Sequence, residues 1–386
     1  MSKYAIKAAK FLLPGAVMAG GYLTIDGNKF GMWSAEAPEG LPVVDESGKW
    51  VAPGLVDTHI HGFYNHATTD CDPDGINASS VELARRGTTS WLPTTFTESS
   101  EHIREACAAI AAADEKRDES FVGAHVQGIY LEGPFFTSKH VGAQNPAYLV
   151  DPSYEDFESW QKAAGGRIRK SALAAERDGA PEYCARLAVE GVVTCVGHSD
   201  ATYAEALAAV NAGATCFVHT YNGMRGLHHR EPGIVGCAMA TPETYAEIIC
   251  DGHHVAPEAI KAVVNAKGWD HVALITDCLG PGGMPEGEYM SGGLPVVMRD
   301  GACYLRDGSS SLAGSIATLA QIVKNVYDWQ IVTAEQALRM ATEVPARSAG
   351  IAGSCGSIMP GRAADFVVLD AELNLEATYM GGKLVE

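Results

Sequence analysis

The residues of this sequence with the clearest chemical potential are histidines and acids that end apolar runs. His59 and His61 lie two residues apart, and on a strand residues i and i+2 point to the same side. Four further residues end apolar runs in the same way: Glu132, His198, His219 and Asp277. A charged or imidazole group at such a position is costly to bury unless it is paired or coordinates a metal. The pattern therefore predicts a catalytic metal centre.

Histidine nitrogens and carboxylate oxygens without a thiolate suit Zn, Fe, Mn, Co or Ni, and the donor set does not choose among them. A single pair such as His59 and His61 also fits two partly exposed polar residues at the end of a strand. The repetition of the pattern on five runs favours the metal centre, with one or two divalent ions, over that alternative.

The elements that must position these residues alternate between short β-branched runs and segments with helical spacing of apolar residues. The strand-like runs are 55–61, 89–95, 126–133, 169–175, 192–199, 214–221, 245–252 and 271–278. The helical segments between them include 99–113, 180–190, 201–212 and 257–267. Eight strands alternating with helices predict a parallel (β/α)8, or TIM, barrel. Active sites in such barrels lie at the C-terminal ends of the strands, where the six residues fall.

The two ends of the chain follow another pattern. Residues 1–53 alternate short apolar pieces with turns that contain Gly, Asn and Asp, and residues 353–386 do the same, with a predicted strand at 364–369. We therefore predict an α/β fold in which the barrel, residues 54–352, is accompanied by a small β-sandwich domain built from both chain termini.

The composition limits the kinds of partner. The chain has 386 residues, of which 47% are hydrophobic and 19% charged, and a formal net charge of −19. This is a globular composition, which excludes a disordered or fibrous protein. The negative charge argues against nucleic acid or an anionic membrane as partner, and an anionic substrate would need a local cationic pocket.

Cysteine usage and the N-terminus indicate the compartment. The ten cysteines include no C-x-x-C pair, which is typical of free, buried thiols in a reducing cytoplasm. Cys195, Cys216, Cys250 and Cys278 lie on predicted strands but are offset from the candidate ligands, so we expect them in the core. Lysines before the apolar run 11–20 resemble a signal peptide, but Pro14 and Gly15 break the run. We expect a cytoplasmic protein without a membrane span.

A cationic cluster follows the sixth predicted strand. Segment 222–233 contains Arg225, His228, His229 and Arg230 among glycines, and His253 and His254 follow the next strand. Arginine grips phosphate in bidentate fashion, and glycines let backbone N–H groups approach an anion. The cluster predicts phosphate recognition; the alternative is a surface ion pair of Arg230 with Glu231 or another acid.

Two further segments are candidate parts of the site. Segment 142–146 contains Gln144, and segment 311–315 contains Leu312, Ala313 and Gly314. The second segment is predicted to begin a helix, whose free N–H groups face a ligand or are capped by Ser315. Five histidines outside this register are expected to be surface or structural residues: His66, His102, His125, His140 and His271.

These stretches together resemble the N-acetylglucosamine-6-phosphate deacetylases of the amidohydrolase superfamily over essentially the full length of the chain. The matching stretches are PGLVDTHIHG from residue 53, YLEGPFF from 130, GHSDAT from 197, HTYNGM from 219, HHREPG from 228, DGHH from 251, LITD from 274, LAGS from 312 and GSIMPGRAADFVVLD from 356. The stretches SWLPTT from 90 and YNGM-RGLHHREPG from 221 resemble the branch that acts on N-acetylgalactosamine-6-phosphate.

The resemblance implies a role for each candidate residue. Glu132, His198 and His219 would hold one divalent metal, with zinc favoured, and His59 and His61 a second, with Glu132 bridging the two. Asp277 would be the general acid and base. The sugar phosphate would be held by Asn222, Gly223, Arg230 and His254, and in this dimeric family some of these reach across the subunit boundary. Gln144 falls where some members have a histidine that polarises the acetyl carbonyl.

The implied reaction is hydrolysis of the acetamido group of N-acetylglucosamine-6-phosphate to glucosamine-6-phosphate and acetate, with the galactosamine epimer as an alternative substrate. A different amidohydrolase, such as a cyclic amidase or a deaminase, remains an alternative, because the barrel does not dictate the substrate. Those enzymes often bridge two metals with a carboxylated lysine on the fourth strand, where Lys170 lies. A non-enzymatic scaffold is the third alternative.

Overall fold

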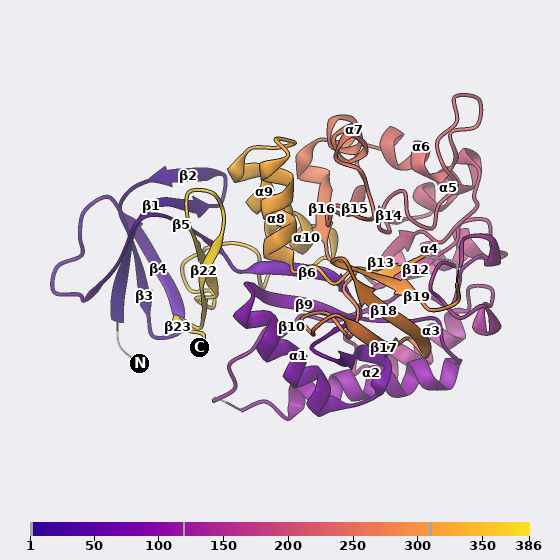
Figure 1. Cartoon of the computed structure of the whole chain (residues 1–386), viewed down its shortest axis with the longest axis horizontal. Coiled ribbons are helices and arrows are strands. Elements are labelled where there is room, and N and C mark those ends of the chain that lie inside the picture. Colours follow the sequence, from indigo (N-terminus) through magenta and orange to yellow (C-terminus); the bar gives the residue numbers. More distant parts are fainter. Residues whose placement is uncertain (1–2, 119, 309–310) are drawn as a thin grey trace.

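The computed structural model describes residues 3–118, 120–308 and 311–386. Its centre is a barrel of eight parallel strands (Figure 1). In order around the barrel they are β6 (Leu55–Ile60), β9 (Thr88–Thr95), β11 (Ile129–Leu131), β12 (Ile168–Leu173), β13 (Val193–Val196), β14 (Ala214–Phe217), β15 (Tyr245–Ile249) and β16 (Val272–Ile275). A short strand β10 (His125–Val126) also pairs with β9. The predicted barrel is confirmed.

The strands form continuous apolar runs because they are buried on both faces. Every residue of β6, β9 and β16 is buried. The last four predicted strands, however, run three to four residues too far at their C-terminal ends, where the chain turns into the barrel mouth.

The barrel closes between β6 and β16 through a few hydrogen bonds. The Asp277 N–H donates to the carbonyl of His59 at 2.9 Å, and the His61 N–H donates to the carbonyl of Cys278 at 2.8 Å. The Thr276 hydroxyl donates to Asp57 Oδ2 at 2.6 Å. Residues of the candidate site therefore also form the seam of the barrel.

The helices lie outside the strands (Figure 1). They are α1 (Pro73–Arg85), α2 (Ser100–Glu115), α3 (Tyr154–Ala163), α4 (Ala180–Val189), α5 (Tyr203–Asn211), α6 (Gly233–Ala240), α7 (Pro257–Lys267), α8 (Leu319–Asp328), α9 (Ala334–Met340) and α10 (Glu343–Ser348). The predicted helices at 99–113, 180–190, 201–212 and 257–267 are thus confirmed as α2, α4, α5 and α7. The start of α5 shows the local cause, since Thr202 and Glu205 form a capping box there.

The predicted helix start at Ser315 is wrong. Segment Leu312–Gly314 is a strand, β20, and α8 begins at Leu319 with Thr318 as its N-cap. The Ser315 hydroxyl instead donates to the carbonyl of Thr276 at 2.5 Å, which ties this segment to the end of β16.

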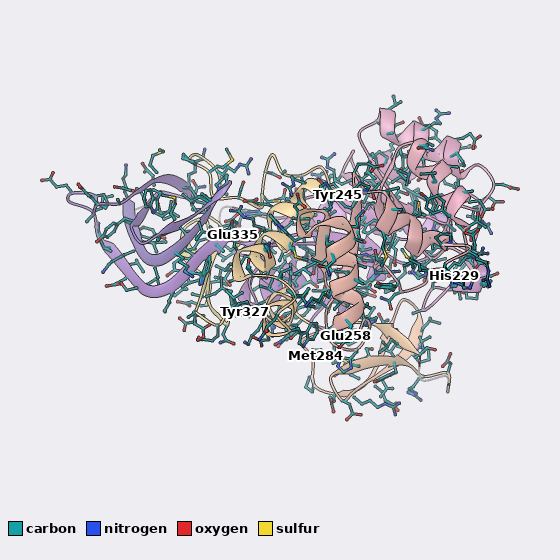
Figure 2. The ribbon with its side chains drawn as sticks, turned by 90° about the horizontal axis from the view of Figure 1, so that it is seen from above. His229, Tyr245, Glu258, Met284, Tyr327 and Glu335 are labelled. Atoms are coloured by element: carbon teal, nitrogen blue, oxygen red, sulfur yellow. The ribbon has the colours of Figure 1, made fainter. Side chains whose placement is uncertain are left out.

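β20 belongs to a four-stranded antiparallel sheet that was not predicted from the sequence. Its other strands are β17 (Gly287–Ser291), β18 (Leu294–Arg299) and β19 (Ala302–Leu305). It has a small core of its own that includes Phe96, Leu279 and Met298. Figure 2 shows the sheet projecting from the barrel near Met284.

The small domain unites both ends of the chain (Figure 1). Its strands are β1 (Lys3–Leu13), β2 (Ala16–Ala19), β3 (Tyr22–Asp26), β4 (Lys29–Ser34), β5 (Val43–Pro53), β21 (Phe366–Leu369), β22 (Leu375–Met380) and β23 (Lys383–Leu384). They form one continuous hydrogen-bonded sheet in which β21 pairs with β5. We propose to divide the chain as predicted, at residues 53/54 and 352/353. The first boundary lies between the end of β5 at Pro53 and the start of β6 at Leu55, and the second lies between the end of α10 at Ser348 and the start of β21 at Phe366.

Two further findings concern the composition. All ten cysteines are free thiols, and the four on or beside barrel strands are buried, as expected: Cys195, Cys216, Cys250 and Cys278. None of the helices in the described part of the chain combines the length and hydrophobicity that crossing a bilayer requires.

Candidate metal centre and substrate cavity

Three of the predicted site residues share an unusual backbone position. His198, His219 and Asp277 each lie two residues past the end of a barrel strand. Their φ angles are 44°, 24° and 50°, in the left-handed region that non-glycine residues seldom adopt. Such conformations persist only where the surrounding structure imposes them, and they cluster at functional sites.

The first group of ligand-type side chains consists of Glu132, His198 and His219. Glu132 Oε1 lies 3.0 Å from His219 Nε2 and 3.3 Å from His198 Nε2. The two imidazole Nε2 atoms are 3.1 Å apart. All three side chains are buried, so these donor atoms meet away from bulk water.

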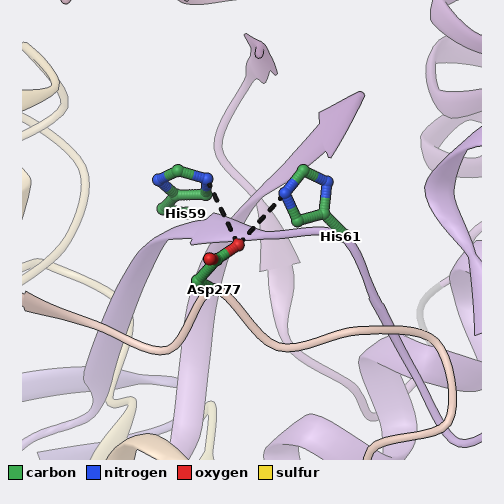
Figure 3. A group of neighbouring side chains, drawn as sticks. All are labelled: His59, His61 and Asp277. Atoms are coloured by element: carbon green, nitrogen blue, oxygen red, sulfur yellow. Dashed lines mark ion pairs between the residues drawn. The ribbon is translucent and has the colours of Figure 1, made fainter. Parts of the chain in front are cut away.

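The second group consists of His59, His61 and Asp277 (Figure 3). Asp277 Oδ1 lies 3.2 Å from His61 Nε2 and 3.6 Å from His59 Nε2. Glu132 connects the groups, because its Oε1 is 3.3 Å from His59 Nε2 and its Oε2 is 3.1 Å from His61 Nε2. The structure thus brings all six predicted residues together.

The hydrogen bonds of the four imidazoles establish which nitrogen faces the centre. The Nδ1 of His61, His198 and His219 each lies beside a backbone carbonyl, at 3.2, 2.8 and 3.1 Å. A carbonyl oxygen only accepts, so each Nδ1 carries a proton, and in the neutral form of these rings Nε2 presents a lone pair. His59 Nδ1 faces a carboxylate, that of Glu247, at 3.0 Å.

These lone pairs fit a divalent cation. Lone pairs and carboxylate oxygens that converge at 3.0–3.3 Å repel one another unless a positive charge lies between them. His59 Nε2 is also buried without a hydrogen-bond partner in the described residues. A cation would satisfy both features, with Glu132, His198 and His219 at one position and His59, His61 and Asp277 at the other.

The charges of the centre also favour a bound cation. Burial raises the pKa of Glu132, but His59, His198 and His219 outweigh burial and hold the pKa well below its ordinary value. Burial lowers the pKa of His59, but Glu132 and Glu247 outweigh it and raise the pKa well above its ordinary value. The carboxylates therefore remain ionised and create a demand for positive charge.

Neighbouring residues hold the histidine rings by close packing. A Cβ at Gly223 would lie 2.9 Å from His198 Nδ1, and one at Gly142 would lie 3.2 Å from His198 Cε1. Phe96 stacks on His61 with ring centroids 4.0 Å apart. The two glycines thus allow the backbone to approach the His198 ring.

A cavity of about 440 Å³ opens above the metal centre. It is lined by most of the predicted site residues: His61, Glu132, Gln144, His198, His219, Asn222, Gly223, His254, Asp277, Leu312, Ala313 and Gly314. Phe96, Gly142, Ala143 and Ser311 complete the lining. This volume suits a small-molecule ligand.

The orientation of Gln144 follows from its hydrogen bonds. Its Oε1 accepts from the N–H of Thr97 at 2.6 Å, and its Nε2 donates to Glu132 Oε2 at 2.6 Å. The amide NH₂ therefore faces the cavity. His254 is held in a similar way, because its Nδ1 lies 2.6 Å from Asp251 Oδ2.

Arg230 does not line the cavity. Its side chain is exposed, with one guanidinium nitrogen 2.8 Å from His229 Nε2, and Figure 2 shows His229 at the edge of the molecule. The alternative, an ion pair between Arg230 and Glu231, is not among the ion pairs of the described residues; Glu231 instead accepts from the N–H groups of Tyr203 and Gly233.

Three residues support the ligands in roles that the sequence did not predict. Glu247 and Lys170 are fully buried beneath the metal centre and form an ion pair. His140, expected to be an ordinary histidine, supplies the carbonyl that holds His198. An acid inside the apolar run 245–252 was the available signal for Glu247.

A barrel whose mouth gathers four histidines and two carboxylates is the architecture of a metal-dependent hydrolase. The amidohydrolase family model matches residues 50–385. An N-acetylglucosamine-6-phosphate deacetylase from Vibrio furnissii is 39% identical over 86% of this chain and 82% of its own. An N-acetylgalactosamine-6-phosphate deacetylase from Escherichia coli O157:H7 is 36% identical over 92% of each chain.

Solved structures agree with these relatives. N-acetyl-D-glucosamine-6-phosphate deacetylase from Mycobacterium smegmatis, a mutant in complex with N-acetyl-D-glucosamine-6-phosphate, superposes with a TM-score of 0.92 at 29% identity, covering 100% of both chains. The N-acetylglucosamine-6-phosphate deacetylase from Pasteurella multocida superposes with a TM-score of 0.91 at 27% identity, covering 99% of both chains. The chain belongs to the amidohydrolase family and, within it, to the N-acetylglucosamine-6-phosphate deacetylase family.

Proposed function

We propose that this chain hydrolyses the acetamido group of N-acetylglucosamine-6-phosphate, releasing acetate and glucosamine-6-phosphate. The observation that carries the proposal is the convergence of six ligand-type and acid–base side chains on one cavity, in a chain whose relatives are named for this reaction. A divalent ion supplies a nucleophilic water at neutral pH and polarises the carbonyl oxygen. Zinc is the ion we favour.

Asp277 is positioned for the proton transfers. Its carboxylate lies at the cavity wall, and His61 and His59 hold its pKa below the ordinary value although burial alone raises it. An ionised Asp277 takes a proton from the attacking water and returns it to the departing sugar nitrogen. Without that transfer the amine is a poor leaving group. The Gln144 NH₂, which faces the same cavity, is placed to donate to the acetyl oxygen.

Two observations argue against the other hydrolases considered. Lys170 is occupied by its ion pair with Glu247 and lies over the ring of Tyr130 at 4.3 Å, so its amine is not free to become a bridging carbamate. Glu132, which contacts His59 and His61 as well as His198 and His219, would take the place of such a bridging group. The complete set of converging side chains likewise disfavours a non-enzymatic scaffold.

The charge of the cavity is our reason for proposing a homodimer. Among the described residues that line the cavity there is no lysine or arginine, and the net charge of −19 repels an anion. Arg230 lies in an exposed segment, 226–230, that follows the cavity residues Asn222 and Gly223 in the chain. We infer that Arg230 of a second copy completes the phosphate site together with His254.

The epimer defines the second candidate substrate. The similarity to an N-acetylgalactosamine-6-phosphate deacetylase, at 36% identity over 92% of each chain, favours testing that sugar as well. The test is a side-by-side kcat/KM for both sugar phosphates, measured as acetate release, with metal content determined on the same preparation. Absence of acetate release from either sugar in metal-loaded protein contradicts the proposal. The free thiols fit a cytoplasmic enzyme of amino-sugar metabolism.

A further inference from the structure

A buried ion pair lies beneath the metal centre. Lys170 on β12 and Glu247 on β15 are both fully buried, and Glu247 Oε1 accepts from Lys170 Nζ. Two strands, β13 and β14, separate β12 from β15, so the pair spans the interior of the barrel. The second oxygen of the carboxylate, Glu247 Oε2, lies 3.0 Å from His59 Nδ1.

Stability does not explain this pair. Removing two charges from water costs several kcal/mol per ion before their attraction repays it, and apolar replacements of similar volume are often neutral or stabilising. The other residues of this interior layer include Tyr130, Cys195 and Cys216, which form part of an apolar core. An apolar pair at positions 170 and 247 would continue that core.

The pair distinguishes His59 from the other three imidazoles of the centre. Their Nδ1 atoms lie beside neutral backbone carbonyls, whereas that of His59 lies beside a carboxylate. A hydrogen bond to an ionised acceptor is about twice as strong as one to a neutral acceptor. A carboxylate partner also makes an imidazole a more basic metal ligand.

We propose that Lys170 and Glu247 are a positioning pair that raises divalent-metal affinity at the position formed by His59, His61 and Asp277. Glu247 orients His59 and increases its donor strength, and Lys170 holds Glu247 in place and balances its charge. The inference rests on the proposed function as a metal-dependent deacetylase. The pair thereby promotes occupation of the second metal position.

The test replaces both charges at once. The double variant Lys170→Met and Glu247→Met keeps similar volumes and leaves no unpaired buried charge. Each protein is stripped with a chelator and titrated with Zn²⁺ against a competing indicator, and its folding is checked by thermal melting. We expect the weaker binding step to lose about 10- to 100-fold in affinity, while the step assigned to Glu132, His198 and His219 changes much less. Unchanged affinities in a folded double variant overturn the inference.

A His59→Gln background separates positioning from a structural role. If the pair acts through His59, its removal in this background leaves the remaining metal affinity unchanged. An equal loss in both backgrounds shows that the pair is structural and overturns the inference. Glu247→Gln keeps an acceptor for His59 without the charge, so this variant should lose less metal affinity than the double variant.

Lys267→Met provides the matched control. Lys267 is also a buried lysine, but it donates to the carbonyls of Ala238 and Thr241 and contacts no residue of the centre. We expect it to lower the melting temperature and to leave both metal steps unchanged. Wild-type protein that binds no divalent metal contradicts the proposed function itself; wild-type binding that is insensitive to the pair overturns only this inference.

Discussion

Each histidine of the centre is oriented by a different part of the fold. Carbonyls of Thr94, His140 and Asn222 hold three of the rings, and Glu247 holds the fourth. Because every Nδ1 has a partner, rotation of any ring costs a hydrogen bond. The donor atoms are therefore arranged before an ion or a substrate arrives, which reduces the reorganisation needed during the reaction.

At the scale of single residues, we predict that Asp277→Asn retains substrate binding but loses turnover. The carboxamide has nearly the same shape, yet it cannot accept and return a proton at neutral pH. Positioned proton transfer is typically worth ~10²- to 10⁴-fold, so kcat should fall by that amount. KM and metal content, measured on the same protein, are the controls. A variant with more than about a tenth of the wild-type kcat excludes Asp277 as the acid and base.

At the scale of elements, the turns after the barrel strands do most of the positioning. The turn after β14 carries His219, Asn222 and Gly223, and the last of these lies against the ring of His198. The turn after β13 contacts this turn as well, because the N–H of Ser199 donates to the carbonyl of Gly223 at 3.0 Å. Two consecutive strands are thus coupled at their C-terminal ends.

We predict that Gly223→Ala weakens the metal centre. The new Cβ would lie 2.9 Å from His198 Nδ1, and the φ of +59° is unfavourable for alanine. The ring or the turn must shift, so metal affinity and kcat should both fall by at least about tenfold. Gly226→Ala in the same loop is the control, since its Cβ would meet nothing within 4 Å. Equal effects of the two substitutions would show that the contact with His198 is unimportant.

At the scale of the whole molecule, the active chain should contain divalent metal. We predict that prolonged chelation removes activity and that added Zn²⁺ restores it, with up to two ions per chain by elemental analysis. The reason is that the inward Nε2 atoms of four histidines converge with the carboxylates of Glu132 and Asp277, a donor set that a divalent cation would satisfy. Full activity in protein shown to be free of metal contradicts this prediction.

With a net charge of −19, the chain needs a local cation to bind a phosphate, and in the homodimer proposed above Arg230 of the second copy provides it. We predict that Arg230→Ala raises KM for the 6-phosphate substrate by about 10- to 150-fold, the range for a charge-assisted hydrogen bond. The unphosphorylated N-acetyl sugar, expected to be a poor substrate, serves as control and should change little. Light scattering on both proteins reports the oligomeric state. Equal losses for both sugars would assign Arg230 a structural role.

Sequence patterns predicted the barrel well because its strands are buried on both faces, which produces continuous apolar runs that stand out between helical segments. The same runs marked the metal centre, since a polar residue that ends such a run needs a partner. Strand ends were less well predicted: His198, His219 and Asp277 lie beyond their strands in left-handed turns. Residue type alone does not specify that conformation.

The misjudged elements depend on contacts between distant parts of the chain. Ser315 is predicted as a helix N-cap, but its hydroxyl instead donates to the carbonyl of Thr276, 39 residues away. The sheet β17–β20 has short strands whose core includes Phe96, from another loop of the barrel. Local propensity contains no information about such partners.

The sequence by itself determined the residue types at the mouth of the barrel and the alternation of elements that brings them there. Only the tertiary structure decided which hydrogen-bond or ion-pair partner each buried polar atom has. Glu247 is 188 residues from His59 and 77 from Lys170, so their contacts exist only after the barrel has closed. The physical reason is that burial makes an unpaired charge expensive, whereas the partner that relieves this cost is selected by the geometry of closure and not by neighbouring residues.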